Sequence, residues 1–206
     1  MVSALTKPLT FEDFVAQYGD DPRYELIDGE LRDLEPTGPH QAIAGHLIAY
    51  LSAAILQHAH KWVIPKSCLI KPPAAEATAL KPDIIVLDRS ALQNEPLWQR
   101  KPIITSGQAI RFIAEIVSTN WQDDYARKIE EYALLRVPEY WVVEHYRGLG
   151  GIDYIGSPKQ PAVTVCNLKG DRYVRQRYWT EQTIQSAMFP DLHITLRESM
   201  AAIADA

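Results

Sequence analysis

The segment FIAEIVSTNWQDDYARKIEEY, residues 112–132, runs from an apolar stretch into a charged one. Glu115 interrupts the apolar stretch. Burying a lone carboxylate in a strand is costly unless a cation pairs with it. The segment therefore predicts a buried strand whose acidic side chain has either a functional role or a cationic partner, and we expect that cation to be a metal ion.

The residues around this segment predict a strand, a helix and a second strand. Residues 109–117 are rich in β-branched residues, as is typical of a strand. Asp123 is suited to cap a helix over about 124–137, and Pro138 marks its end. The following run EYWVVEHY is again strand-like. A strand, helix and strand within about forty residues are typical of a crossover unit, which predicts that the strands at 109–117 and 140–146 are parallel.

The rest of the chain predicts further strands and helices on both sides of this unit. The other predicted features are a hairpin that turns at Asp28-Gly29, an amphipathic helix over 40–60, strands over 62–70 and 83–87, loops at 72–82 and 88–108, and an antiparallel hairpin that turns at Lys169-Gly170-Asp171. We therefore expect an α/β fold with a mixed central sheet, an N-terminal β-hairpin and extra antiparallel strands near the C-terminus.

The composition is that of an ordinary globular protein. With 206 residues, of which 47% are apolar and 23% charged, the chain is expected to form one domain over 1–206. We find neither the apolar core of a signal peptide nor the roughly 18 apolar residues of a membrane helix, so we expect a cytoplasmic protein without a membrane partner. Cys68 and Cys166 are far apart and are expected to be reduced core residues.

The charge is unevenly distributed along the chain. The net charge is −5, which argues against a protein that coats nucleic acid. Residues 1–60 hold 3 Lys and Arg against 9 Asp and Glu, whereas residues 61–111 hold 8 against 4. Scattered solvated charges are one interpretation of this excess. The other is a local phosphate-facing surface that draws on Lys66, Lys71, Lys81, Arg100, Lys101 and Arg111.

Two acids and a lysine form the candidate site. Asp83 follows Pro82 at the start of a predicted strand, and Glu115 lies late in another. Two carboxylates that meet at neighbouring strand ends repel each other unless they are protonated or bridged by a hard divalent cation such as Mg²⁺. The backbone carbonyl near Ile116 is a further possible ligand, and Lys128 in the following helix can reach the same strand ends.

This set of groups fits hydrolysis of a phosphodiester. A metal ion lowers the pKa of a bound water, and a lysine can orient that water or stabilise developing charge. Two alternatives stay open. Lys128 and Glu115 could form a purely structural ion pair. A glycosidase could use Asp83 and Glu115 as acid and base, although it would need an aromatic-lined sugar cleft and would leave Lys128 without a role.

Five short blocks occur in a fixed order along the chain. They are YELIDGE at 24–30, KPD at 81–83, EIVS at 115–118, KIEEY at 128–132 and VPEYW at 137–141. Together they resemble the Uma-two (Uma2) family of the PD-(D/E)XK nuclease superfamily, and the resemblance covers about residues 11–195. It implies a restriction-endonuclease-like fold, in which helices flank a mixed sheet, and an activity that depends on Mg²⁺ or Mn²⁺.

The resemblance also implies roles for individual residues. Asp83 and Glu115 match the two metal-binding acids of the superfamily. The superfamily lysine would lie two places after Glu115, where this chain has Val117, and Lys128 is expected to supply the ammonium group from the helix instead. Auxiliary candidates are Glu25, His40 and Tyr132.

The sequence therefore predicts a metal-dependent endonuclease that hydrolyses DNA, with no small-molecule organic cofactor. By analogy with other nucleases of this fold, a homodimer is expected. The alternative from another functional class is a non-catalytic binding or regulatory module that keeps the nuclease fold. The acidic net charge and the displaced lysine favour this alternative.

Overall fold

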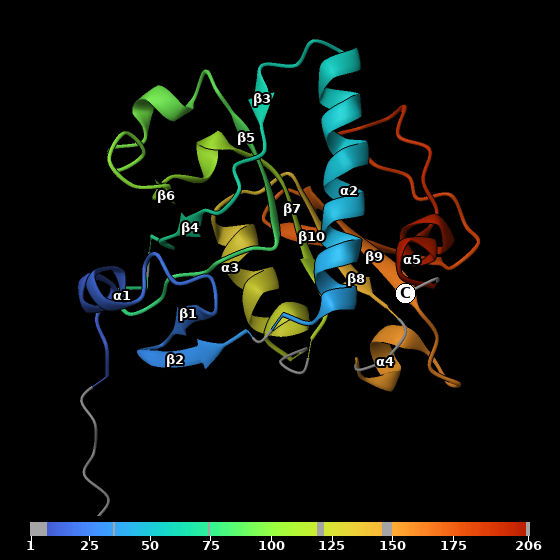
Figure 1. Ribbon diagram of the computed structural model, residues 1–206, viewed down its shortest axis with the longest axis horizontal. Helices are drawn as coiled ribbons and strands as arrows, with labels where there is room; N and C mark the ends of the chain where they lie inside the picture. Colours follow the sequence, from blue (N-terminus) through green and yellow to red (C-terminus); the bar gives the residue numbers. More distant parts are fainter. Residues whose placement is uncertain (1–7, 35, 74, 119–121, 146–149, 205–206) are drawn as a thin grey trace, which may run out of the picture.

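The centre of the structure, a computed structural model, is a six-stranded mixed sheet (Figure 1). The structure describes residues 8–34, 36–73, 75–118, 122–145 and 150–204. The strands of this sheet, in spatial order, are β10 (Arg172–Trp179), β9 (Ala162–Lys169), β8 (Glu139–Glu144), β7 (Ile110–Ile116), β5 (Ile84–Asp88) and β3 (Trp62–Val63). Only β7 and β8 are parallel, and the other neighbours are antiparallel. The predicted mixed sheet is confirmed.

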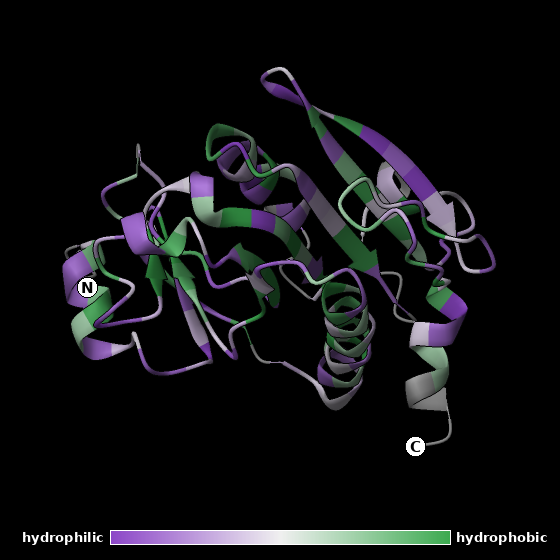
Figure 2. Cartoon of the chain, turned by 90° about the horizontal axis from the view of Figure 1, so that it is seen from above, coloured by the Kyte–Doolittle hydropathy of each residue, from purple (hydrophilic) through white to green (hydrophobic). Residues whose placement is uncertain are grey.

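Helices cover both faces of this sheet. On one face lie α2 (Gly38–Gln57) and α5 (Leu196–Ala204), and on the other lies α3 (Lys128–Leu134) (Figure 1). Successive side chains of a strand point to opposite faces, so each central strand contributes to two apolar layers. In β7, Phe112 packs in the layer of α2, whereas Ile113 packs in the layer of α3. Figure 2 shows the hydrophobic colouring concentrated in the central strands.

A smaller N-terminal layer lies at one end of the main sheet. Its elements are α1 (Phe11–Gln17), the hairpin β1 (Tyr24–Ile27) and β2 (Glu30–Asp33), and the parallel pair β4 (Leu69–Ile70) and β6 (Ile103–Ile104). Phe14 and Leu26 are fully buried in its apolar cluster. Further described elements are the short helix α4 (Ile152–Ile155) and the 3₁₀ turns Leu92–Asn94 and Gly107–Ala109.

Both predicted hairpins are confirmed. The first turns at Asp28 (φ 51°) and Gly29 (φ 81°), and two left-handed residues are what a tight hairpin turn demands. The second, β9–β10, turns at Gly170 (φ 60°). The first turn is also tied to the segment before α3, because Arg127 Nη2 lies 2.8 Å from Asp28 Oδ1.

The predicted crossover unit is confirmed, but its helix is shorter than expected. Phe112 pairs with Glu139 in the parallel register of β7 and β8, and α3 lies between the two strands in sequence. The expected helix over 124–137 is wrong at both ends. A π-helical turn, Asp123–Arg127, precedes α3, and Arg136 adopts φ 61°, which ends the helix before Pro138. The side chain of Asp123 lies outside the described residues.

The single strand expected over 62–70 is wrong. It divides into β3, which pairs with β5, and β4, which pairs with β6 in a separate sheet. Pro65 lies between them and has no N–H to donate to a strand ladder. The expected loop at 88–108 likewise contains β6 and the two 3₁₀ turns.

Cys68 and Cys166 are free and buried, as predicted. Burial raises the pKa of each thiol to about 12, so both are poor nucleophiles. Within the described ranges of the chain, no helix has the length and apolar character needed to cross a membrane.

We predict that Phe112→Ala lowers the free energy of unfolding by about 3–5 kcal/mol, because it opens a cavity in the layer under α2. Phe112 is fully buried, with its ring centroid 5.2 Å from that of Trp141 and 5.7 Å from that of Phe189. Urea unfolding measures the change. The control Leu134→Ala, at a side chain that is 65% exposed, should change the stability by less than about 0.5 kcal/mol. Equal effects of both variants would contradict this packing.

Candidate functional site

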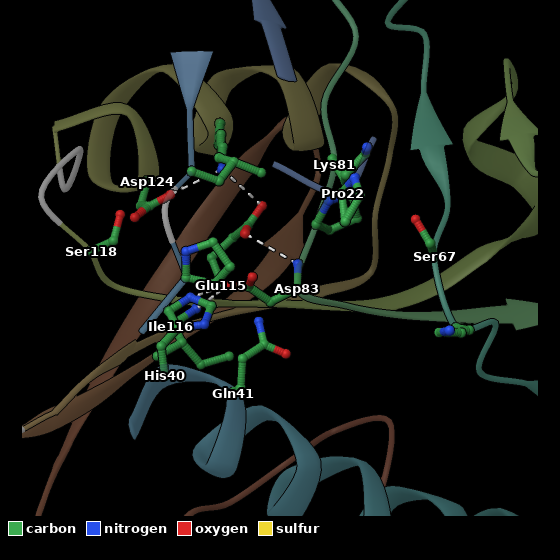
Figure 3. A pocket seen from close by; sticks show the side chains of 15 residues that line it. Pro22, His40, Gln41, Ser67, Lys81, Asp83, Glu115, Ile116, Ser118 and Asp124 are labelled. Carbon is green, nitrogen blue, oxygen red and sulfur yellow. Dashed lines mark hydrogen bonds and ion pairs between the residues drawn. The ribbon is translucent and has the colours of Figure 1, made fainter. Parts of the chain in front are cut away.

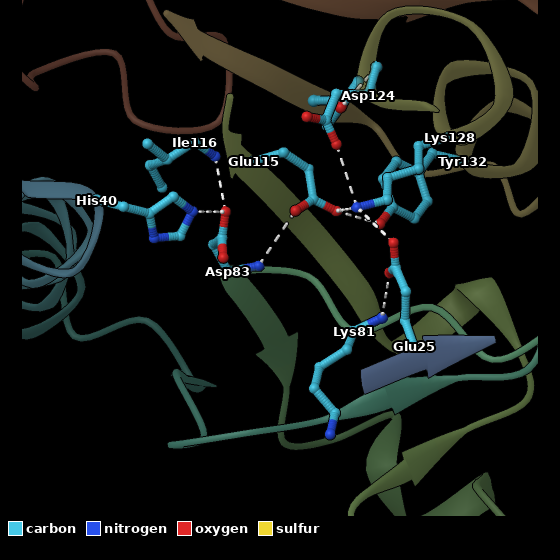
Figure 4. A network of polar contacts seen from close by, with 10 residues as sticks. Glu25, His40, Lys81, Asp83, Glu115, Ile116, Asp124, Lys128 and Tyr132 are labelled. Carbon is cyan, nitrogen blue, oxygen red and sulfur yellow. Dashed lines mark hydrogen bonds and ion pairs between the residues drawn. The ribbon is translucent and has the colours of Figure 1, made fainter. Parts of the chain in front are cut away.

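The register of β5 against β7 brings Asp83 and Glu115 together. Ile84 pairs with Ala114, so Asp83, one residue before β5, lies opposite Glu115 near the end of β7. The Asp83 N–H donates to Glu115 Oε2 at 3.3 Å, and the Ile116 N–H donates to Asp83 Oδ2 at 2.7 Å (Figure 4). Two acids that are remote in sequence are thus joined directly through backbone hydrogen bonds.

Lys128 of α3 lies among three carboxylates. Its ammonium nitrogen is 3.3 Å from Glu115 Oε1, 3.3 Å from Glu25 Oε1 and 3.1 Å from Asp124 Oδ1 (Figure 4). Strand alternation turns Glu115 toward α3, and Asp124 and Tyr132 lie four residues before and after Lys128. The Tyr132 hydroxyl donates to Glu115 Oε1 at 2.7 Å. All five side chains are buried.

His40 approaches Asp83 from α2, on the other face of the sheet. Its Nε2 lies 3.1 Å from Asp83 Oδ2. Burial lowers the pKa of His40, but the hydrogen bond and charge of Asp83, together with the Ile116 carbonyl, outweigh burial and raise it. The contact with His40 fixes one oxygen of Asp83.

Glu25 ties the N-terminal hairpin to this site. Its Oε1 contacts Lys128, and its Oε2 accepts a hydrogen bond from the Lys81 N–H at 3.2 Å. Lys81 belongs to the segment that leads into β5. One carboxylate thus contacts both α3 and the approach to Asp83.

The site holds more carboxylates than ammonium groups. Burial raises the pKa of Glu115 well above its ordinary value; the Lys128 ammonium opposes this shift, and Asp83 adds to it. Burial also raises the pKa of Asp124 to about 7, again against the effect of Lys128. Burial lowers the pKa of Lys128, but Glu115 and Glu25 outweigh it and hold that pKa well above its ordinary value. Lys128 therefore stays charged, and the excess of acids favours a further cation.

This network borders a pocket of about 300 Å³ (Figure 3). Within it, the side chain of Asp83 is 20% exposed. The lining residues are Pro22, Leu34, Pro36, His40, Gln41, Lys66, Ser67, Lys81, Pro82, Asp83, Glu115, Ile116, Ser118, Asp124 and Lys128. Asp83 is therefore accessible to a small ligand or to one group of a larger one, and the buried Glu115 lines the pocket behind it.

The oxygen atoms around Asp83 fit a hard divalent cation. Among the described residues, no group of three or more His, Cys, Asp and Glu side chains is arranged to hold a metal ion. Mg²⁺ needs fewer, because it takes one or two protein carboxylates and completes its octahedron with water and phosphate oxygen. Asp83 Oδ1 accepts no hydrogen bond from the described residues, and Glu115 Oε2 accepts only the long one from Asp83. Ile116 also lines the pocket, and its carbonyl contributes to the raised pKa of His40.

Comparison with known proteins assigns the chain to a family. The family model Uma2, described as "Putative restriction endonuclease", matches residues 11–197. The chain belongs to the Uma2 family. The sequence-based resemblance is thus confirmed. No curated protein matches this Uma2 chain.

A solved structure confirms the predicted fold. It is described as "a putative nuclease belonging to DUF820" from Anabaena variabilis, and the Uma2 chain is 16% identical to it with a TM-score of 0.67. The match covers 95% of this chain and 99% of the other. At this identity the likeness shows the fold alone, which is the restriction-endonuclease-like arrangement of a mixed sheet between helices.

The structure brings together the site residues that were predicted from the sequence of this Uma2 chain. Asp83, Glu115, Lys128, Glu25, His40, Tyr132 and Ile116 all belong to one connected set. Asp124 was not predicted as a member, although its spacing of four residues from Lys128 on a helix is a recognisable signal.

The expected phosphate-facing surface is only partly present. Lys71 pairs with Glu12 and Arg111 with Asp88, so these cations already have acidic partners. Lys66 and Lys81 do line the pocket. The positive charge near this Uma2 site therefore comes from a small part of the predicted set.

We predict that Lys128→Met destabilises the protein by about 3–5 kcal/mol at pH 8, because it leaves buried carboxylates without a cation. In the wild type, burial raises the pKa values of Glu115 and Asp124, the latter to about 7, and the charge of Lys128 limits this rise. Without it, keeping these acids ionised in the folded state costs more. A carboxyl whose folded pKa is raised contributes stability at low pH and loses it as pH rises. The loss should therefore be smaller at pH 5.

Urea unfolding at both pH values in EDTA measures this difference. Lys169→Met, at an exposed lysine near the β9–β10 turn, is the matched control and should be close to neutral at either pH. A loss in Lys128→Met that is the same at pH 5 and pH 8 would mean that charge compensation is not what Lys128 provides.

Proposed function

We propose that this Uma2 protein is a metal-dependent endonuclease that hydrolyses DNA phosphodiester bonds. The observation that supports it most directly is the adjacency of Asp83 and Glu115 at an open pocket, with Lys128 on the inner oxygen of Glu115. Family membership is the second support, because the family model is described as "Putative restriction endonuclease".

In this proposal Asp83, Glu115 and the Ile116 carbonyl hold Mg²⁺ or Mn²⁺. When bound, the ion would lower the pKa of a water molecule and neutralise charge on the phosphoryl oxygens. Asp83 presents Oδ1, because His40 and the Ile116 N–H fix Oδ2. Asp83 thus needs little reorganisation to act as a ligand.

The groups behind Glu115 keep it oriented. Tyr132 and Lys128 both contact Oε1, which leaves Oε2 toward Asp83 and the pocket. Lys128 keeps its charge in the buried site and offsets the carboxylates. In the proposed reaction this ammonium group assists the attacking water and the developing negative charge.

A non-catalytic nuclease-fold module is the second candidate. The burial of Lys128 favours it, because the side chain is 4% exposed and its ammonium already has three carboxylate partners. Such an ammonium group could serve only the fold. The endonuclease would cut DNA and the non-catalytic module would not, so a DNA cleavage assay decides between them. The homodimer and the cytoplasmic location stay predictions.

We predict that Mg²⁺ raises the melting temperature of the wild type and that Asp83→Asn and Glu115→Gln reduce or abolish this rise. A ligand that binds only the folded state stabilises it by about 2.7 kcal/mol at a concentration of 100 Kd. Both amides keep the shape of the side chain but remove the charge that attracts a hard cation. Calorimetric titration in Mg²⁺ and Mn²⁺ checks the binding directly.

The matched control for these variants is Asp171→Asn. Asp171 has a 92% exposed side chain and pairs only with Arg136 among the described residues. Surface pairs of this kind contribute about 0–1 kcal/mol. The control should keep the full response to Mg²⁺. If Asp83→Asn and Glu115→Gln bind the ion as tightly as the control, the assigned ligands are wrong.

We predict that the wild type nicks supercoiled plasmid in Mg²⁺ or Mn²⁺ and is inactive in EDTA. Asp83→Asn and Glu115→Gln should slow nicking by about 10²-fold or more, as expected when a single charge-stabilising group is removed from a catalytic site. Asp171→Asn should nick at the wild-type rate. Nicking at one rate in all preparations would indicate a contaminant, and DNA binding without nicking would favour the non-catalytic module.

A further inference from the structure

Three residues of the pocket lining differ in chemistry from the acids. Lys66 and Ser67 come from the segment between β3 and β4, and Gln41 comes from α2. In Figure 3, Ser67 and Asp124 lie on opposite sides of Asp83. These residues bring an ammonium, a hydroxyl and an amide to the pocket, all of which can donate hydrogen bonds.

Lys66 differs from the other lysines of the pocket. Lys128 is surrounded by carboxylates, and Lys81 Nζ donates to the Asp21 backbone carbonyl. Lys66 is exposed, and its ammonium forms no ion pair or hydrogen bond with the described residues. Its charge is therefore available to an anion that approaches the pocket.

The backbone fixes Lys66 and Ser67 relative to the acids. Before them, Val63 pairs with β5, the strand that follows Asp83. After them, Cys68 is buried and the Leu69 N–H donates to the Pro102 carbonyl at 2.8 Å. Only short side chains and one lysine chain have to be ordered when a ligand binds, which limits the entropy cost.

The N-terminus of α2 adds a positive potential to the same pocket. The helix has 20 residues, is capped by Thr37, and has no acidic residue in its first turn. His40 and Gln41, in this first turn, line the pocket, and His40 is 94% buried with Nδ1 lacking a hydrogen-bond partner among the described groups. Helix N-termini attract anions, phosphate groups included.

We propose that Lys66, Ser67 and Gln41 form a phosphate subsite that binds a phosphodiester of the DNA strand next to the group at Asp83 and Glu115. This inference rests on the proposed function. A pocket of about 300 Å³ is too small for a duplex, being at the lower end of the roughly 300–1,000 Å³ of small-ligand sites. The adjoining backbone therefore stays at the rim, where Lys66 and Ser67 are exposed.

The subsite is independent of base sequence. A lysine contacts phosphate as a point charge, and contacts to the backbone position a protein without reading the bases. Lys66 also offsets the repulsion between the acids and the polyanion before a cation neutralises those acids. The subsite thus determines which phosphodiester of the strand reaches Asp83.

Salt-dependent DNA binding tests the subsite. Fluorescence anisotropy of a labelled duplex gives the binding constant K from 50 to about 200 mM salt, in EDTA and at early times in Mg²⁺. Each lost phosphate contact reduces the steepness of the plot of log K against log salt by about 0.9. Lys66→Gln should show this loss for every duplex sequence, and Lys66→Arg should restore the wild-type slope. Ser67→Ala should weaken binding without changing the slope.

Lys169→Gln is the matched control, since Lys169 is an exposed lysine away from the pocket, at the end of β9. It should bind as the wild type does. A Lys66→Gln slope equal to that of wild type or control, or no DNA binding by the wild type, overturns the subsite. Plasmid nicking on the same samples separates the two proposals. Nicking without an effect of Lys66 removes only the subsite, whereas a Lys66-dependent slope without nicking removes only the enzymatic function.

Discussion

The rest of the site depends on the ion pairs that Lys128 forms with the surrounding carboxylates. Glu25, Glu115 and Asp124 come from three different elements, and each contacts the same ammonium group. Burial raises the pKa values of Glu115 and Asp124, and the ammonium group opposes this shift toward the neutral forms. One buried cation thus lets the fold keep several carboxylates beneath an open pocket, and Asp83 is left free to face solvent.

Fold and site share one set of constraints. The antiparallel register of β5 and β7 brings Asp83 opposite Glu115, and the alternation that buries Ile113 under α3 also turns Glu115 toward Lys128. A register shift of one residue would send Glu115 to the α2 face. The apolar packing of the central strands therefore does more than stabilise the protein, because it sets the positions of the acids.

Much of this arrangement could be predicted from sequence because its signals are local. A carboxylate within an apolar strand and an acid at a strand start are conspicuous, and the ordered blocks around Asp83, Glu115 and Lys128 indicated the family. By contrast, the short length of α3 and the division of residues 62–70 into two strands could not be predicted from the sequence. The π-helical turn is an uncommon local form whose cause is not evident in the residue pattern, and β4 joins a partner, β6, more than thirty residues away. Asp124 was missed because its spacing from Lys128 also suits an ordinary surface pair.

The contacts of Glu25 have a consequence for how the molecule unfolds. This residue belongs to the N-terminal hairpin, yet its carboxylate contacts Lys128 and the backbone of Lys81. The Asp28–Arg127 pair adds a second link between the same hairpin and the π-helical turn. Detaching the hairpin would uncover the buried ammonium group, which couples the opening of the hairpin to that of α3. Amide hydrogen exchange in β1 and α3 should therefore report one cooperative unit.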